Sequence, residues 1–161
     1  MTEDSADDVP TNVRASSGWQ AVLDDAEATA DEYRERGWTA LVVHPGDAVM
    51  VDSERRRGLD VVVPDPEYDE VASLVAAHEF DDVAVFRAED DGLVYLLVVE
   101  RATAAAVAVL VPAYYDPGAA GSTLSAIRDA GEISLFCRRL GDESVEFVHD
   151  DPTPFMPASP E

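Results

Sequence analysis

Apolar residues recur with helical spacing in the first third of the chain, from Trp19 to Tyr33. The stripe repeats every three or four residues, with acidic residues between its members: Trp19, Val22, Leu23, Ala26, Ala30 and Tyr33. Such spacing places the apolar side chains on one face of a helix. Ser17 followed by Gln20 matches a capping box, and Gly37 suits the residue that ends a helix. The pattern predicts an amphipathic helix that packs on one side only.

Two further helices are predicted to begin at Asp-Pro pairs. Asp65 is expected to be the N-cap of the second helix, with Pro66 as its first helical residue. The third helix is expected to begin near Asp116-Pro117 and to end at Gly131. Both predictions depend on proline, which fits the first turn of a helix because its nitrogen needs no partner there.

Strand patterns follow each helix as pairs of apolar segments that flank a turn. Three hairpins are expected, formed by residues 38–43 with 48–51, 83–87 with 93–100, and 133–139 with 144–149. Residues 59–63 and 104–111 predict two additional strands that end in proline. The segments 93–99 and 107–111 are almost continuously apolar, which is typical of strands that are buried on both faces.

Together these elements predict an α+β fold: a mainly antiparallel, partly mixed sheet of about seven to eight strands with three helices on it. Short connections favour one domain over residues 16–151. Residues 1–15 are acidic and aperiodic, which predicts a disordered tail. The three prolines near the end of the chain predict an irregular, Pro-rich C-terminal tail over residues 152–161.

Charge changes the picture of the solvent in which the protein works. The chain has 34 acidic residues against 11 basic ones, a formal net charge of −23, and its basic residues are all arginine. Self-repulsion at this charge is tolerable in multimolar salt, where the Debye length is about 3 Å. The composition therefore favours a protein of a high-salt cytoplasm over an acidic interaction protein of ordinary cytosol. No membrane segment or signal peptide is evident.

Basic residues are too few to favour nucleic-acid binding, since that affinity comes from neutralising phosphates. The single basic run is Arg55-Arg56-Arg57, without interleaved aromatic residues, and a solvated loop explains it better. Cys137 lies within a predicted strand and is interpreted as a buried structural thiol. We find no phosphate loop or nucleophile elbow, and we expect no cofactor.

Two histidine segments could hold a metal ion. His44 with Asp47, and His149 with Asp150, offer ligand types that zinc or manganese accepts, provided that distant strand ends meet. Ordinary turn chemistry is the favoured explanation of the first segment, and no local metal motif is present.

A third candidate is the segment Tyr114-Tyr115-Asp116, after a predicted central strand. Asp116 suits a helix cap, and two exposed tyrosines suit the rim of a binding site. We rank this segment above the histidines.

Several longer motifs resemble a family of uncharacterised haloarchaeal proteins. They are YRERGW (33–38), VHPGD (43–47), GLDVVVP (58–64), VVER (98–101), PAYYD (112–116) and HDDPTPF (149–155). The resemblance covers nearly the whole chain after the first tail and implies a haloarchaeal cytoplasm. It implies no activity and no catalytic residues.

Two functions stay open on these residues. The favoured one is a non-enzymatic module that binds an unidentified protein partner or small ligand. The alternative is a small metal-dependent hydrolase or nuclease that uses His44, Asp47, His149 and Asp150. The distance between the two histidines discriminates between them. The sequence does not indicate an oligomeric state.

Overall fold

The computed structural model describes residues 16–141 and 143–157, and the predicted tail over residues 1–15 lies outside them. Three α-helices, eight strands and one short 3-10 helix are described. In chain order they are α3 (Ser16–Glu35), β1 (Thr39–Val42), β2 (Asp47–Asp52), β3 (Arg57–Val62), α4 (Asp65–Ala77), β4 (Asp82–Asp90), β5 (Leu93–Ala102), β6 (Val107–Tyr115), α5 (Gly121–Ala130), β7 (Ile133–Arg138), β8 (Ser144–His149) and η1 (Thr153–Phe155).

The strands form two mixed sheets of four, and the prediction of a single larger sheet is wrong. Sheet A has the order β1-β6-β5-β4, and sheet B has the order β2-β3-β7-β8. Each sheet contains one parallel pair, β1 with β6 and β3 with β7, and its other pairs are antiparallel. The α+β class and the three helices are confirmed.

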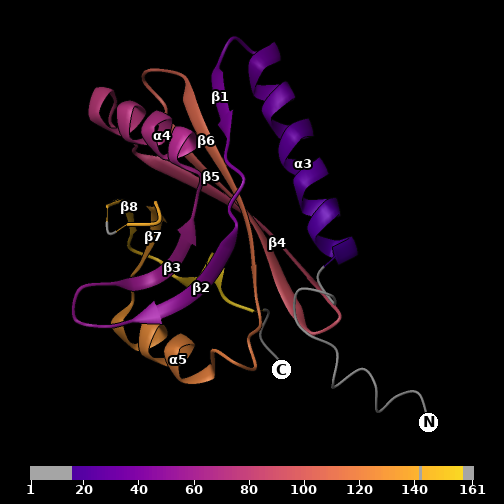
Figure 1. Cartoon of the computed structure of the whole chain (residues 1–161), viewed down its shortest axis with the longest axis vertical. Helices are drawn as coiled ribbons and strands as arrows, with labels where there is room; N and C mark the ends of the chain where they lie inside the picture. The colour runs from indigo at the N-terminus through magenta and orange to yellow at the C-terminus, as the bar shows by residue number, and fades with distance from the viewer. Residues whose placement is uncertain (1–15, 142, 158–161) are drawn as a thin grey trace.

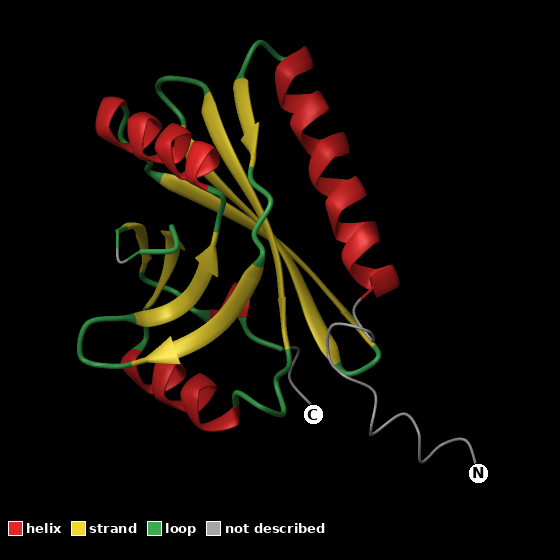
Figure 2. Cartoon of the chain, viewed as in Figure 1, coloured by secondary structure: helices red, strands yellow, loops and turns green. Residues whose placement is uncertain are grey.

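Helix α3 covers one side of sheet A, while α4, α5 and the strands β2 and β3 lie on the other side (Figure 1). The same division is clear when helices and strands are coloured separately (Figure 2). A central core fills the space between the two sheets and includes residues of α4 and α5. A smaller helix core lies between α3 and sheet A.

Strand β5 shows how one segment serves both cores. Its odd-numbered residues Leu93 to Val99 belong to the helix core, and its even-numbered residues Val94 to Val98 belong to the central core. This follows from the alternation of side chains along a strand. Because both faces are covered, the near-continuous apolar sequence is explained, and the predicted central position of β5 and β6 is confirmed.

The first predicted hairpin is absent, because its two strands enter different sheets. β1 pairs with β6 in sheet A, and β2 pairs with β3 in sheet B. The segment Pro45-Gly46 is therefore a crossing between sheets and not a hairpin turn. The sequence misled here because a Pro-Gly-Asp turn looks the same whether the chain returns or continues.

The other two hairpins, β4–β5 and β7–β8, are confirmed. Asp91 and Gly92 join β4 to β5 with φ values of 54° and 79°. Positive φ at both central residues is the condition for the turn type that suits a two-residue hairpin.

The starts of two helices differ from the predictions. Pro64, and not Asp65, is the N-cap of α4. Asp65 instead places its carboxylate 3.3 Å from the guanidinium of Arg139. Helix α5 begins five residues later than Asp116, at Gly121, although its predicted end at Gly131 is confirmed by a left-handed conformation there.

The C-terminal prolines do not form a separate tail over residues 152–157. Thr153–Phe155 form the short helix η1, and the side chains of Phe155 and Met156 are buried in the central core. Arg87 of β4 donates a hydrogen bond to the carbonyl of Met156 at 2.8 Å. The three prolines do not exclude helical structure here, since proline fits the first turn of a short helix.

Candidate functional site

The strongest candidate site is a pocket of about 560 Å³ at the place where the chain passes from β1 in sheet A to β2 in sheet B. We call it the junction pocket. Residues from α3, the β1–β2 crossing, β2, the end of β6 and the start of α5 line it: Trp19, Pro45, Gly46, Asp47, Ala48, Val49, Met50, Ala113, Tyr114, Tyr115, Asp116, Ala119, Ala120 and Thr123. Clefts of this size suit small organic ligands.

The pocket exists because β6 is longer than its neighbour β1. Pairing between them ends at Val42 with Leu110, and Val43 donates one more hydrogen bond to the carbonyl of Leu110. Backbone groups of alternate residues point to the same side of a strand, so those of Pro112 and Tyr114 also point toward the side where β1 has ended. Pro112 has no N–H to satisfy, which suits a strand edge without a neighbour.

Aromatic rings form one wall of the junction pocket. The ring centroids of Trp19 and Tyr114 are 5.5 Å apart in an edge-to-face arrangement, and Tyr114 lies 5.8 Å from Tyr95 on the opposite strand. A Cβ atom at Gly18 would come within 2.4 Å of the Tyr95 ring. Glycine therefore allows the start of α3 to lie directly on this aromatic row. Trp19 is a site residue that sequence reasoning assigned only to the helix stripe.

The structure brings the three predicted rim residues together at this pocket but gives them different environments. Tyr114 is half-buried, whereas Tyr115 is buried and donates a hydrogen bond from its hydroxyl to the carbonyl of Phe155 at 2.7 Å. Burial raises the pKa of Tyr115 well above its usual value. The expectation of two exposed tyrosines is thus wrong for Tyr115, because adjacent residues on a strand face opposite sides.

Asp116 is also different from its prediction, since it caps a turn before α5 and not the helix itself. Its Oδ1 atom accepts a hydrogen bond from the N–H of Gly118 at 2.9 Å. The N-cap of α5 is Ala120, without a side-chain hydrogen bond. Among the described lining residues, Asp116 and Asp47 are the two acidic ones.

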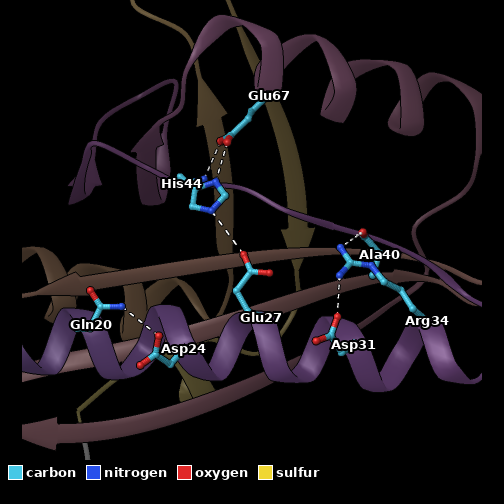
Figure 3. A network of polar contacts seen from close by, with 8 residues as sticks. All are labelled: Gln20, Asp24, Glu27, Asp31, Arg34, Ala40, His44 and Glu67. Carbon is cyan, nitrogen blue, oxygen red and sulfur yellow. Dashed lines mark hydrogen bonds and ion pairs between the residues drawn. The ribbon is translucent and has the colours of Figure 1, made fainter.

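His44 fixes the crossing segment that forms part of the pocket wall (Figure 3). Glu67 of α4 accepts hydrogen bonds from both the backbone N–H of His44, at 2.6 Å, and its ring Nδ1, at 2.7 Å. The other ring nitrogen lies 3.7 Å from the carboxylate of Glu27 on α3. His44 thereby connects a helix on each side of sheet A, and the next residues, Pro45 to Asp47, enter the pocket wall.

His149 takes part in a different cleft, of about 710 Å³, between β8, β4 and the C-terminal segment. Its Nε2 atom lies 2.7 Å from Oε2 of Glu100, and its ring stacks on Phe155 with centroids 5.6 Å apart. Glu100 is buried on β5, where it continues the even-numbered row of the central core. Burial raises the pKa of Glu100, and the hydrogen bond and charge of His149 offset this only in part.

The four proposed metal ligands are divided between these regions. Asp47 lines the junction pocket, His44 is bonded to Glu67, and His149 and Asp150 line the second cleft. Among residues 16–141 and 143–157, no three His, Cys, Asp or Glu side chains are arranged to hold a metal ion. His44 follows β1 in sheet A and lies beside Glu67, whereas His149 is the last residue of β8 in sheet B and lies beside Glu100, so the two segments do not share a site.

Cys137 is buried in the central core, as predicted. Burial raises the pKa of its thiol to about 12, with Glu100 and Asp60 adding to the shift. A thiol of this kind stays protonated at neutral pH and is a poor nucleophile. Its role is therefore packing.

These observations define the class of protein: an α+β protein of two mixed four-stranded sheets with an aromatic pocket at their junction. The chain belongs to DUF7529, a family of unknown function, whose sequence profile matches residues 6–157. No curated protein and no solved structure matches the chain. Among the described residues, no helix combines the length and the apolar composition needed to cross a membrane.

Proposed function

We propose that the protein is a non-enzymatic module that binds a small organic ligand in the junction pocket. The observation that supports this is the pocket itself, which several elements build together where the two sheets diverge. Ligand pockets are favoured where the connections from neighbouring strands diverge, as at the switch points of α/β sheets. The aromatic wall supplies apolar contact area, and the edge of β6 supplies polar groups.

Binding is favoured over catalysis by the side chains that surround the pocket. The described residues that line it include no His, Cys, Ser or Lys, and each of its two carboxylates, Asp47 and Asp116, accepts a hydrogen bond from a nearby backbone N–H. The Tyr115 hydroxyl is already engaged by the carbonyl of Phe155. The side chains that remain can hold a ligand but do not form a nucleophile–base pair.

Filling the pocket tests this function. Ala119→Leu adds a bulky side chain at an exposed lining position of the pocket. Ala76→Leu makes the same change at an exposed position of α4 and serves as the control. Small organic compounds are screened by the rise in melting temperature in 2–3 M KCl. Compounds that stabilise the wild type and Ala76→Leu, but not Ala119→Leu, support the proposal. Compounds that stabilise all three proteins equally would contradict it.

We also propose that the protein works in the high-salt cytoplasm of a haloarchaeon. The absence of lysine and the net charge of −23 support this. A neighbouring pair of like charges ~7 Å apart costs roughly 0.5 kcal/mol in water without salt, so many such pairs rival a typical folding stability. Salt removes most of that cost. The melting temperature should rise steeply from low salt to 2 M KCl, and a flat profile would contradict the proposal.

A further inference from the structure

We propose that the ligand of the junction pocket is an organic cation with an apolar body, such as a quaternary ammonium compound. This rests on the proposed function, and it adds the chemical class of the ligand. Three features of the pocket support the inference: its aromatic wall, the sign of its charged side chains, and the apolar residues of the remaining wall.

The aromatic wall is suited to a cation. Trp19 and Tyr114 meet edge to face, so the face of one ring lies against the edge of the other and a ring face remains available to a ligand. Both residues are half-buried, which leaves part of each accessible from the pocket. A cation within about 6 Å of such a ring is attracted by its quadrupole, and tryptophan is the best partner.

Among the described residues that line the pocket, the charged side chains are all of one sign. Asp47 and Asp116 line it, and among the described lining residues none is Arg, Lys or His. The carboxylate of Asp47 is exposed and, among the described residues, accepts one hydrogen bond, from the adjacent N–H of Ala48 at 3.0 Å. The start of α5 opposes these acids, but a helix N-terminus carries only about +0.5 elementary charge. Two formal negative charges therefore outweigh it, and an anionic ligand is disfavoured.

The remaining wall accepts an apolar body. It includes four alanines and the larger apolar side chains of Val49 and Met50. Alanine leaves room beside the rings, and methionine adapts its shape to an irregular ligand. A methylated ammonium group has this combination of positive charge and apolar surface. An inorganic cation lacks the apolar surface and would leave most of the pocket unused.

Three probes of matched shape test the inference in the full chain. Choline carries the charge, 3,3-dimethylbutan-1-ol is its neutral isostere, and 3,3-dimethylbutanoate carries a negative charge. The reporter is the fluorescence of Trp19 in a Trp38→Phe background, which is safe because Trp38 packs on Tyr33 and does not line the pocket. In 1 M KCl we expect choline to bind about tenfold more tightly than the neutral isostere, and the anion more weakly than both.

A charge-removing variant localises the effect. Asp47→Asn should weaken choline binding about twofold in 1 M KCl, because salt screens this exposed carboxylate, and should leave binding of the neutral isostere unchanged. Asp52→Asn, at the other end of β2, is the control and should change neither.

The outcomes separate this inference from the proposed function. Equal affinity for choline and its isostere, lost for both in Ala119→Leu, would overturn the cation class and leave the binding function standing. Choline binding that Ala119→Leu does not affect would lie elsewhere and would overturn both. Preference for the anion would overturn the cation class alone.

Discussion

The β5–β6 hairpin carries a cleft at each of its ends, and the two clefts are built differently. At one end, Glu100 of β5 meets His149 of β8 inside a cleft with several acidic residues. At the other end, Tyr114 of β6 forms the aromatic wall of the junction pocket. The first cleft holds a buried glutamate–histidine pair, Glu100 and His149, joined by a hydrogen bond. The second holds aromatic surface and a strand edge without a neighbour.

The difference indicates which cleft is structural and which is available to a ligand. The Glu100–His149 pair joins sheet A to sheet B, because β5 and β8 belong to different sheets. Breaking a buried pair of this kind is costly, so the pair is suited to hold the sheets together. Among the described residues, no hydrogen bond or ion pair holds the side chains of Trp19 and Tyr114, the two rings that meet at the junction pocket. A ligand can therefore contact them without displacing an interaction that the fold needs.

The largest expected effect comes from breaking the buried pair. His149→Ala should lower the free energy of unfolding by about 3–5 kcal/mol at pH 7, because it leaves the Glu100 carboxylate buried without its partner. Urea unfolding in 2 M KCl measures this. His44→Ala is the matched control: its ring also lies 2.7 Å from a glutamate, but 52% of the His44 side chain is exposed against 12% for His149. The control should lose less than about 1 kcal/mol.

The loss of stability caused by His149→Ala should depend on pH, and the sign of this dependence follows from the pKa of Glu100. The pKa of Glu100 is raised in the folded protein, so its contribution to stability is fully present below about pH 4.5 and is lost as pH rises through the raised value. His149→Ala removes the hydrogen bond and charge that lower this pKa. The stability difference between variant and wild type should therefore grow from pH 5 to pH 7.5. A difference that stays constant or shrinks would show that Glu100 does not depend on His149.

Much of the fold could be predicted from local patterns, and its division into two sheets could not. The stripe from Trp19 to Tyr33 and the Asp91-Gly92 turn each describe contacts between neighbours in the chain. The separation of β1 from β2 depends on the parallel pairing of β1 with β6, almost 70 residues later along the chain (Thr39 with Val107). Neither Pro45 nor Gly46 shows whether the chain turns back on the same sheet or continues into the other sheet.

The candidate site was predictable at the level of a segment but not of its partners. Tyr114 to Asp116 do line the pocket, and their position after a central strand was the signal. Glu67 and Glu100 were missed, although Glu100 interrupts an apolar strand at a core position, which is the mark of a buried charge with a partner. The helical stripe predicts only that Trp19 is buried, because it does not show which other element the first turn of the helix contacts.

A smaller effect is expected at the boundary between the two regions, where Tyr115 bonds to the C-terminal segment. Tyr115→Phe removes the hydroxyl and leaves the carbonyl of Phe155 buried without that donor, which should cost about 1–2 kcal/mol. The neighbouring change Tyr114→Phe is the control, since no hydrogen bond of its hydroxyl is found among the described residues. Thermal unfolding in 2 M KCl compares them, and equal losses would mean that the Tyr115 hydroxyl does not anchor η1.

The smallest change in stability, and the sharpest test of the comparison, is expected at Glu67. Its carboxylate accepts two hydrogen bonds from His44, yet the His44 ring is half in solvent, so Glu67→Ala should cost only about 0.5–1 kcal/mol. Asp52→Ala removes the exposed partner of Arg57 and should lower the free energy of unfolding by no more than this.

The two variants should nevertheless differ at the junction pocket. Glu67 holds His44, and the residues that follow His44 form the pocket wall, so Glu67→Ala frees that wall while Asp52→Ala leaves it in place. Trp19 faces the same pocket and reports the change: its fluorescence in a Trp38→Phe background should become more accessible to a neutral quencher such as acrylamide in Glu67→Ala alone. A large loss of stability with no change in quenching would assign Glu67 to the fold and would remove the distinction between a structural end and a ligand-binding end of the hairpin.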